Sequence, residues 1–563
     1  MKPIFFPCLL ACALIFPASS EAETFYWDGA TGGGWDQNTN WATTLEGGTD
    51  PAGVPGAGDT AVFSVTGLTG ARAVNLNGNR QVAGLEFNNA DTVTLQAGGT
   101  NRILELGAGG IIAGAATKTV NIGSTTTNQN VSISLMAAQA WTYNSTAASP
   151  VNGWGIYVRN AVSLGISGTH TLTLGGTISS TNPLSAVSGA VSDGAGTLNI
   201  EMSGNNNLRW TLSGDNSYTG TTVVKNGGLT IGHVNALGST STGTTVESGA
   251  SIFLRSTIGS IAAEALTISG SGSGSSGALR NVNGVNTWNG AITLAGSTYI
   301  GADSGAGSIF TLSETATISR SGAGDRIATF MGGGTIEVQG AINGDIAVTR
   351  GVNGTLLMTG AAKAYTGATN ISSNGHMILN TSLSGTSQVT VNGNLRGNGG
   401  SIRTGAAVSV TGTGVLAPGT SSTVQDIGIL SMGALSLQNL STMALDIHSG
   451  DLTSDVVEVT SLNLTNGAVL TVNDLGSSTI GIGEALLFIK NSGAWNGGFF
   501  TVNGTLIGDE STTFAVGANT FQIDYNYSGG LGTGVALISV VPEPTAPALV
   551  SLAALTMMFR RRK

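Results

Sequence analysis

The segment TIEVQGAINGDIAVTRGVNGTLLM (335–358) contains three short runs in which apolar residues alternate with other residues. The apolar pairs recur at intervals of ten residues, as Ile336/Val338, Ile346/Val348 and Leu356/Met358. Alternation places these side chains on one face of an extended strand, and the glycines between the runs are typical of turns. One strand and one turn in every ten residues fit either a β-meander or one side of each coil of a β-solenoid.

The same pattern covers most of the chain. Short alternating runs recur between Phe25 and Val540, at Val93/Leu95, Leu172/Leu174, Leu229/Ile231, Leu266/Ile268, Ile292/Leu294, Val389/Val391, Val408/Val410, Leu435/Leu437 and Leu462/Leu464. Two all-β architectures compete, an array of β-sandwich domains and one elongated parallel β-helix. Separate sandwiches need linkers, and no proline-rich or charged linker occurs between residues 65 and 540. The sequence therefore favours an elongated right-handed parallel β-helix, and coils of roughly 20 residues would give about 25 coils and a rod on the order of 120 Å long.

The composition of the 563 residues agrees with stacked strands. Charged residues make up only 9% of the chain, where about 25% is usual, and 87 residues are glycine. In a stack, outward side chains lie about 4.8 Å from similar neighbours, so like charges repel whereas Asn, Ser and Thr can hydrogen-bond in rows. Twenty-one Lys and Arg against 31 Asp and Glu give a net charge of −10, which is the wrong sign for a nucleic-acid-binding protein.

The N-terminus has the parts of a secretory signal peptide. Lys2 precedes an apolar run over 4–16, and small residues lead up to Ala22, after which we expect cleavage and export through the Sec pathway. The alternative is a lipoprotein signal at Cys12, although only eleven residues precede that cysteine. Both cysteines, Cys8 and Cys12, lie within 1–22, so we expect a mature chain without disulfides or thiolate chemistry.

The C-terminus carries three distinct parts in order. They are the tripeptide Pro542, Glu543 and Pro544, the apolar segment 545–559, and the basic end Arg560, Arg561, Arg562 and Lys563. Fifteen helical residues rise only about 22 Å, short of the ~30 Å apolar core of a bilayer, so the segment is a poor permanent span; a short tail anchor is the alternative. The order of parts resembles the PEP-CTERM sorting signal. That resemblance implies a Gram-negative source, transient inner-membrane contact through 545–559, and processing by an exosortase-type membrane protease.

Two segments of the body resemble each other. They are LSGDNSYTGTTVVKNGGLTIG (212–232) and MTGAAKAYTGATNISSNGHMIL (358–379), which share Tyr-Thr-Gly at 218–220 and 365–367. Both resemble the autotransporter-associated β-strand repeat, in which a turn with an Asn-x-Tyr-x-Gly pattern separates two strands. The resemblance implies a β-solenoid fold of the autotransporter passenger type.

This resemblance places repeats near 205–254 and 354–402. The second copy departs from the pattern, because His376 is aligned with Leu229 of the first. An autotransporter ends in a membrane barrel of alternating strands, where this chain has the sorting tail. We therefore expect a passenger-like rod that is exported by separate secretion machinery.

The sequence predicts no catalytic, cofactor-binding or metal-ligating residue. The four histidines are more than sixty residues apart, which fits no local metal-binding spacing: His170, His233, His376 and His448. Acids do group together, in one case Asp451, Asp455 and Glu458 and in another Asp509 and Glu510. A β-helix polysaccharide lyase or hydrolase would need such acids beside aromatic residues, and we interpret them instead as solvated turn residues.

Aromatic residues crowd the start of the predicted mature chain. They are Phe25, Tyr26, Trp27, Trp35 and Trp41. We interpret them as an end cap that covers the core of the first coil. The alternative is that Trp27, Trp35 and Trp41 contact a glycan.

The expected organisation has four parts. Residues 1–22 form the signal peptide, 23–429 the β-solenoid, 430–540 either a continuation of it or a β-sandwich-like cap, and 541–563 the sorting segment. We expect a non-enzymatic structural or adhesive protein of the cell surface, extracellular matrix or medium, without cofactors and without nucleic-acid partners. The alternatives are a glycan-binding surface protein that contacts extracellular polysaccharide and a β-helix polysaccharide lyase or hydrolase.

Overall fold

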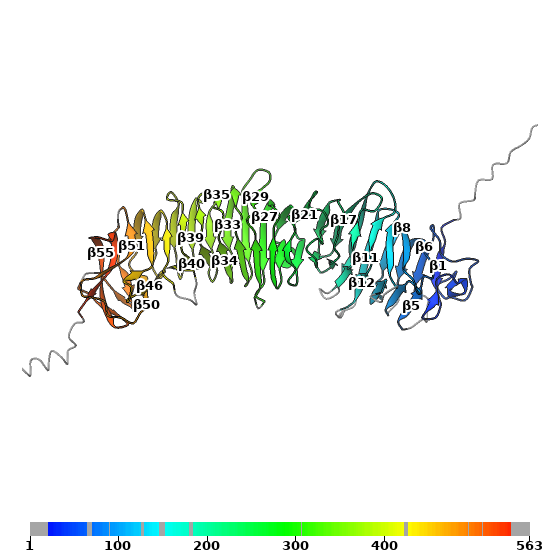
Figure 1. The fold of residues 1–563 in the computed structure, drawn as a ribbon, viewed down its shortest axis with the longest axis horizontal. Coiled ribbons are helices and arrows are strands. Elements are labelled where there is room, and N and C mark those ends of the chain that lie inside the picture. Colours follow the sequence, from blue (N-terminus) through cyan, green and yellow to red (C-terminus); the bar gives the residue numbers. More distant parts are fainter. Residues whose placement is uncertain are drawn as a thin grey trace, which may run out of the picture.

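The protein is elongated, with its two ends at opposite tips of the molecule and its strands lying across the long axis (Figure 1). The structure is a computed structural model that describes residues 21–541 apart from 65–69, 89–90, 125–128, 146–152, 180–183, 306, 421–425, 494 and 509–510. The chain is all-β, with 53% of it in strands and no α-helix among the described residues. Two short 3-10 turns, Asn38–Asn40 and Ser273–Ser275, interrupt the strands.

Successive runs of the 335–358 segment, ten residues apart, belong alternately to two different sheets. Strand β31 (Thr335–Val338) pairs in parallel with β34 (Thr355–Met358), so that Ile336 lies beside Leu356. Between them in sequence, β33 (Ile346–Arg350) pairs instead with β30 (Arg326–Met331) in a different sheet. Each run is therefore one side of a layer, as in a solenoid, and the segment is not a meander.

The largest sheet contains 33 strands, and one unbroken row of parallel pairs runs through it from Thr24 to Leu464. The row consists of β1 (Thr24–Trp27), β4 (Thr60–Phe63), β6 (Arg80–Phe87), β8 (Arg102–Ala113), β11 (Gln139–Ser145), β14 (Thr169–Ile178), β17 (Thr197–Gly204), β19 (Thr222–Asn226), β21 (Thr244–Val246), β24 (Leu266–Gly270), β27 (Ile292–Ala302), β30, β33, β36 (Thr369–Ile371), β39 (Gln388–Val391), β42 (Ala407–Val410), β45 (Ala434–Leu437) and β49 (Ser461–Leu464).

Layers are longer in many places than the roughly 20 residues expected. Leu172 pairs with Gln139, thirty-three positions earlier, whereas Leu356 pairs with Ile336, twenty positions earlier. Some of the extra residues lengthen the strands, since β11 has seven residues and β34 has four. The others lie in the turns, where length is tolerated because a longer loop costs little additional closure entropy. The long row accordingly has eighteen strands among the described residues, fewer than the 25 coils that a uniform spacing would give.

A second sheet covers another side of the C-terminal half. Its strands are β23 (Gly259–Ile261), β26 (Val285–Trp288), β28 (Ile309–Leu312), β31, β34, β37 (His376–Leu379), β40 (Asn394–Gly397), β43 (Val415–Pro418), β46 (Thr442–His448), β50 (Ala468–Asp474), β52 (Phe500–Val502) and β53 (Thr505–Leu506), with β47 (Thr453–Ser454) beside β46. Only the pairings β46–β47 and β52–β53 are antiparallel.

A third sheet of eight strands begins near residue 382 and extends to the C-terminal end of the described chain. Its strands are β38 (Ser382–Leu383), β41 (Gly400–Ile402), β44 (Ile429–Ser431), β48 (Val456–Val459), β51 (Ala485–Asn491), β56 (Gly532–Val540), β55 (Asn519–Gly529) and β54 (Phe514–Val516). Pairing is parallel up to β51 and antiparallel from β51 to β54. Residue 430 lies inside β44, and the parallel stacking passes through it without interruption.

One hydrophobic core occupies the interior from Phe25 to Leu537. Inward positions of successive strands supply it, as in β33, where Ile346 and Val348 are buried and the residues between them are half-buried. Burial of such side chains stabilises a fold by about 25 cal/mol per Å² of apolar surface. Parallel pairing and a continuous core are incompatible with the alternative of separate antiparallel β-sandwich domains.

The two resembling segments share a buried tyrosine. Tyr218 and Tyr365 are both fully buried, and their hydroxyls lie 2.7 and 2.6 Å from the hydroxyls of Thr222 and Thr369. In each copy the threonine after the tyrosine donates a hydrogen bond to an aspartate of the preceding layer, Asp193 or Asp345. The Tyr-Thr-Gly motif therefore fixes the same contact between layers in both places.

The copies differ by one inserted residue, which corrects the alignment made from sequence. Leu229 faces inward beside Trp210, and the residue that faces inward beside Leu356 is Met377. His376 is half-buried on the other face of the strand. The second copy has an extra turn residue before this strand, so His376 does not replace Leu229.

Candidate functional site

The three tryptophans predicted as an end cap or a glycan contact are buried together at the N-terminal end. Trp27, Trp35 and Trp41 are 2%, 0% and 0% exposed. The ring of Trp41 lies 5.1 Å from that of Trp27 and 4.9 Å from that of Trp35, both edge to face, and Phe63 closes the cluster from β4. Buried rings cannot stack on a sugar, so the predicted glycan contact is wrong, and the cluster packs as the first layer of the core.

The predicted sorting-signal residues, 542–563, lie outside the described residues, as does most of the signal peptide. Among the residues that the structure describes, no helix has both the length and the apolar character needed to cross a membrane. The predicted membrane contact at 545–559 lies beyond this part of the chain.

The histidines and acids singled out from sequence do not converge. In the described part of the chain, no group of three or more His, Cys, Asp or Glu could hold a metal ion. His448 pairs with Asp451 at 3.1 Å, whereas Asp455 is buried and accepts hydrogen bonds from the backbone N–H groups of Gly428 and Asp446. Glu458 points outward on β48 and is paired elsewhere. The other predicted acids, at 509–510, are outside the described residues.

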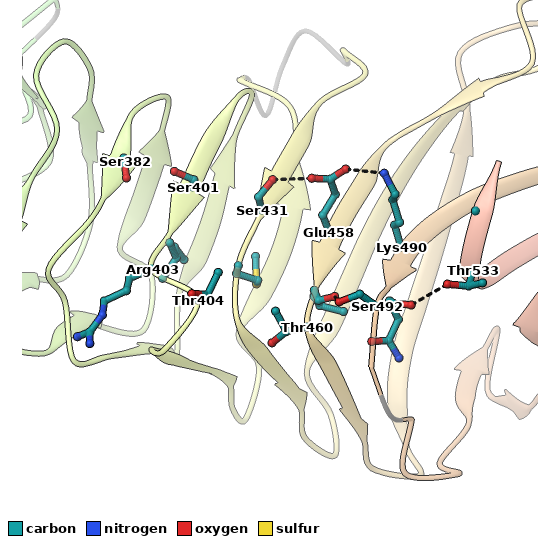
Figure 2. Close-up of a pocket in the computed structure, with 15 residues that line it drawn as sticks. Ser382, Ser401, Arg403, Thr404, Ser431, Glu458, Thr460, Lys490, Ser492 and Thr533 are labelled. Atoms are coloured by element: carbon teal, nitrogen blue, oxygen red, sulfur yellow. Dashed lines mark hydrogen bonds and ion pairs between the residues drawn. The ribbon is translucent and has the colours of Figure 1, made fainter.

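A hollow lies on the surface of the eight-stranded sheet (Figure 2). Five outward residues follow one another in register across neighbouring strands, from β38 to β51: Ser382, Ser401, Ser431, Glu458 and Lys490. We call this line of side chains the polar row. With strands about 4.8 Å apart, four steps extend the row over roughly 19 Å along the molecule.

The polar row borders a groove of about 620 Å³. Apolar side chains at its floor include Met432 and Val459, which are nearly buried, and Arg403, Thr404, Thr460, Ser492 and Thr533 line its other margin. The groove thus combines an apolar floor with polar margins, a composition typical of a site for a small or extended polar ligand.

The charges of the groove are held by hydrogen bonds within the polar row. Glu458 accepts a hydrogen bond from the Ser431 hydroxyl at 2.9 Å and one from the Lys490 ammonium group at 3.2 Å. These two donors hold the pKa of Glu458 below its ordinary value. The groove therefore presents a carboxylate and a cation that are paired with each other. It also presents the hydroxyls of Ser382 and Ser401, which have no hydrogen-bond partner within the described part of the chain and can exchange hydrogen bonds with a ligand.

Sequence reasoning missed the groove because its residues come from strands that are far apart in the chain. Glu458 stood out only as part of an acidic group, and its neighbour Lys490 is thirty-two positions away. A local alternation identifies which residues face outward, but it does not identify which outward residue of the next layer lies beside them. That register depends on turn lengths, which vary along this chain.

Two cations in the interior serve the backbone. Arg350 is fully buried and donates to the carbonyl oxygens of Phe330, Gly332 and Gly354. Lys363, also fully buried, lies 2.7 to 3.0 Å from four carbonyl oxygens, those of Gln339, Gly340, Thr359 and Ala361. Both side chains donate to backbone carbonyl oxygens in turns and at strand ends, and three of these oxygens, those of Phe330, Gly354 and Gln339, also accept a backbone N–H. We therefore assign both side chains a structural role.

Comparison with known proteins adds no family. No protein-family model matches the chain, and no curated protein is similar to it.

Proposed function

We propose that this chain is an exported, non-catalytic structural or adhesive protein of the cell surface or extracellular matrix. The observation that carries the proposal is the single parallel row from Thr24 to Leu464 over one core, which makes the molecule long and stiff. We further propose that the sheets close into a right-handed β-helix, since crossovers between parallel strands are right-handed in nearly all proteins.

The proposed location rests on the resemblance of the two ends to a Sec signal peptide and a PEP-CTERM tail. In this proposal an exosortase-type protease removes the tail after transient contact of 545–559 with the inner membrane. Deletion of 541–563 should leave the protein at that membrane or in the periplasm, as detected by fractionation of cells that produce the full-length chain. An unchanged distribution would contradict the sorting proposal and would leave the structural role untouched.

The structural role is tested by loss of the protein from the matrix. A strain without this chain should form a mechanically weaker extracellular layer, and export of the wild-type chain should restore it. The chain with Lys363→Met serves as the comparison, because its loss of a buried contact should weaken the rod while its ends stay intact. Normal layers in the deletion strain would overturn the structural proposal.

The groove beside the polar row favours a second candidate, the binding of a neutral glycan. Its hydroxyls, its fixed Glu458–Lys490 pair and its apolar floor suit sugar hydroxyls and sugar faces. The paired change Glu458→Gln with Lys490→Gln keeps the net charge, since it removes one charge of each sign. It should weaken retention on a glycan array by about tenfold, the effect of losing two charge-assisted hydrogen bonds.

Lys225→Gln with Glu201→Gln is the matched control, because it removes an ion pair of the same kind on another face. Equal retention of wild-type protein and groove variant would exclude the groove as the glycan site. Release of new reducing ends from any glycan that the protein retains would favour the enzymatic alternative instead.

A further inference from the structure

Three arginine side chains gather around one phenylalanine. Their strands come between β17 and β27 in sequence, and these two strands lie in the middle part of the molecule (Figure 1). The Cζ atom of Arg209 lies 4.8 Å from the centre of the Phe253 ring, and those of Arg255 and Arg280 each lie 5.9 Å from it. These distances are within the range of cation–π contacts. We call the three arginines and Phe253 the arginine cluster.

The cluster is built by neighbouring parallel strands. Arg209 begins β18 (Arg209–Leu212), Phe253 lies on β22 (Ser251–Leu254) and Arg280 on β25 (Leu279–Asn281), with β20 (Gly228–Ile231) between the first two. Ile252 and Leu254 point into the core, so Phe253, between them on the strand, points to the outer face. Phe253 is nevertheless fully buried, because the arginines and adjoining strands cover its ring. Gly228 makes room for it, because a Cβ at that position would collide with the ring.

Among the described residues, only one of the three arginines forms an ion pair with a carboxylate, although the charge of that carboxylate, Asp303, also acts on Arg255. Arg280 is bound by both oxygens of Asp303, at 2.8 and 2.7 Å. Among the described residues, the guanidinium groups of Arg209 and Arg255 have no ion pair or hydrogen bond, and the Nε atom of each is buried without a partner. Both side chains are half-buried, so their outer nitrogens reach solvent. The guanidinium groups of Arg209 and Arg255 therefore lie around the same ring, and neither forms an ion pair within the described chain.

A neighbouring hydroxyl is also left without a partner. Thr230 lies next to Phe253 in the register of the sheet and is 5% exposed, yet its Oγ1 atom forms no hydrogen bond within the described chain. Burial and the repulsion between the arginines both disfavour the charged form of Arg209. Burial, together with the charges of Arg255 and Arg280, lowers the pKa of Arg209 to about 10. An anion bound to the guanidinium groups would offset both the desolvation of the buried charge and the repulsion between the arginines.

We propose that Arg209 and Arg255, held beside the Arg280–Asp303 ion pair, form a binding site for the carboxylate groups of an acidic polysaccharide. A guanidinium group matches a carboxylate in shape and binds it through two parallel hydrogen bonds. The inference goes beyond the proposed structural role, since binding can be measured on purified protein regardless of where the protein is located.

The charge of the remaining chain selects this class of ligand. Residues 23–559 hold 16 Lys and Arg against 30 Asp and Glu, so a densely charged polymer would be repelled outside the cluster. Duplex DNA carries one charge per roughly 1.7 Å of its axis, whereas a uronate chain carries at most one per sugar. The sugar hydroxyls between the carboxylates suit the Ser, Thr and Asn side chains of this surface.

The test is a binding titration of the purified full-length chain with fluorescein-labelled octagalacturonate. The wild-type protein should bind it at about 50 mM NaCl and bind it more weakly at about 300 mM, because salt screens charge pairing. The double variant Arg209→Gln/Arg255→Gln should bind about tenfold or more weakly. Arg209→Lys/Arg255→Lys keeps the charge and the packing but not the paired donors, so its affinity should be intermediate.

The matched control is Arg320→Gln/Arg326→Gln, which removes two arginines that donate to loop carbonyls on another layer. This control variant loses the same net charge as Arg209→Gln/Arg255→Gln but keeps the arginine cluster. It should therefore bind the oligosaccharide as the wild type does. Equal weakening of both double variants, equal binding of the methyl-esterified oligosaccharide, or no binding at low salt would overturn the proposal. Tighter binding of single-stranded DNA would overturn the assigned ligand class. None of these outcomes bears on the shape or location of the protein.

Discussion

At the scale of single residues, buried polar side chains determine how neighbouring layers fit together. Tyr218 and Tyr365 bring a hydroxyl into the core and place it against a threonine four positions later. A buried hydroxyl without a partner would be unfavourable, so each pair constrains the turn that joins the two residues. The motif is therefore recognisable in sequence because its chemistry tolerates little change.

Tyr218→Phe should destabilise the protein by about 1 to 2 kcal/mol, because the buried Thr222 hydroxyl loses the tyrosine as its partner. Tyr365→Phe should cost about 1 kcal/mol, because the Thr369 hydroxyl keeps its hydrogen bond with Thr386. Urea unfolding followed by tryptophan fluorescence measures the change. Tyr299→Phe is the control, since Tyr299 is half-buried on the outer side of β27 and should be close to neutral. A control variant that loses as much stability as Tyr365→Phe would contradict the role given to the buried pair.

Lys363 is a stronger case, because its ammonium group lies among four carbonyl oxygens. Lys363→Met keeps the length of the side chain and removes every donor, so it should cost about 3 kcal/mol or more. Lys225→Met removes an exposed lysine paired with Glu201 and should change the stability much less, because solvent screens a surface ion pair. Thermal unfolding measures the melting temperatures of the two variants. Similar melting temperatures would contradict the claim that the buried contacts of Lys363 contribute more to stability than the exposed ion pair of Lys225.

At the scale of elements, Asp455 links strands of two sheets. Its oxygens accept backbone hydrogen bonds from Gly428, just before β44, and from Asp446 of β46, at 2.8 and 2.9 Å. Burial raises the pKa of Asp455 to about 7, and the charges of Asp446 and Asp426 act in the same direction. Since the folded state holds this proton more tightly than the unfolded state, the stability of this region should fall as pH rises from about 4 to about 7.

The measurement is hydrogen exchange of the Asp446 and Gly428 amides across that pH range, corrected for the intrinsic rate. Asp455→Asn cannot ionise, so its local stability should not depend on pH in this window, although it should be lower overall because the amide nitrogen cannot accept one of the two backbone hydrogen bonds. Glu458→Gln is the control on the neighbouring exposed carboxylate. An Asp455→Asn variant with the wild-type pH dependence would show that another group titrates.

The turns between strands depend on glycine where layers touch. A Cβ at Gly290 would collide with the backbone carbonyl oxygen of Glu264 in the preceding layer, whereas a Cβ at Gly58 would meet nothing within 4 Å. Gly290→Ala should therefore separate the two layers and cost about 2 kcal/mol or more, while Gly58→Ala should be neutral or slightly stabilising. Differential scanning calorimetry compares the variants, and a neutral Gly290→Ala would mean that the turn adjusts freely.

The elements could be predicted from sequence, but the position of each beside its neighbours could not. Alternation identified Ile336, Ile346 and Leu356 as inward residues, and glycines identified the turns. Register was out of reach, because the spacing between partners depends on turn lengths that no local pattern specifies. For the same reason Met377 was overlooked as the counterpart of Leu229, and neither the polar row nor the arginine cluster was foreseen. Burial of Trp27 in an end cap was the first interpretation, and the glycan contact stayed open as an alternative because aromatic residues suit both a core and a sugar-binding surface.

At the scale of the whole molecule, the two ends of the stack are closed differently. The tryptophan cluster fills the first layer, where β1 also pairs antiparallel with β3 (Trp41–Ala42). At the other end, β56, β55 and β54 cover β51 with antiparallel pairing. Strands left open at an end would expose backbone groups that can pair with another molecule.

Removal of residues 511–541 should therefore promote end-to-end association beyond that of the intact chain, because the edge of β51 becomes available. Size-exclusion chromatography with light scattering would detect this association at rising protein concentration. Changing Leu487 to Lys in the truncated chain should reduce the association, since a charge on an open edge discourages pairing. A truncated chain that associates no more than the intact chain at any concentration would show that the antiparallel strands are not a barrier to growth.

The strands cross the long axis, so the hydrogen bonds between successive layers point along it (Figure 1). A force that pulls the two ends apart would load these layers in series, and the weakest layer would open first while the others stay folded. Each layer of about 25 residues would shorten the rod by roughly 5 Å and release about 85 Å of extended chain. Under tension the molecule would therefore lengthen layer by layer and absorb work at each step, which would make it an extensible tether.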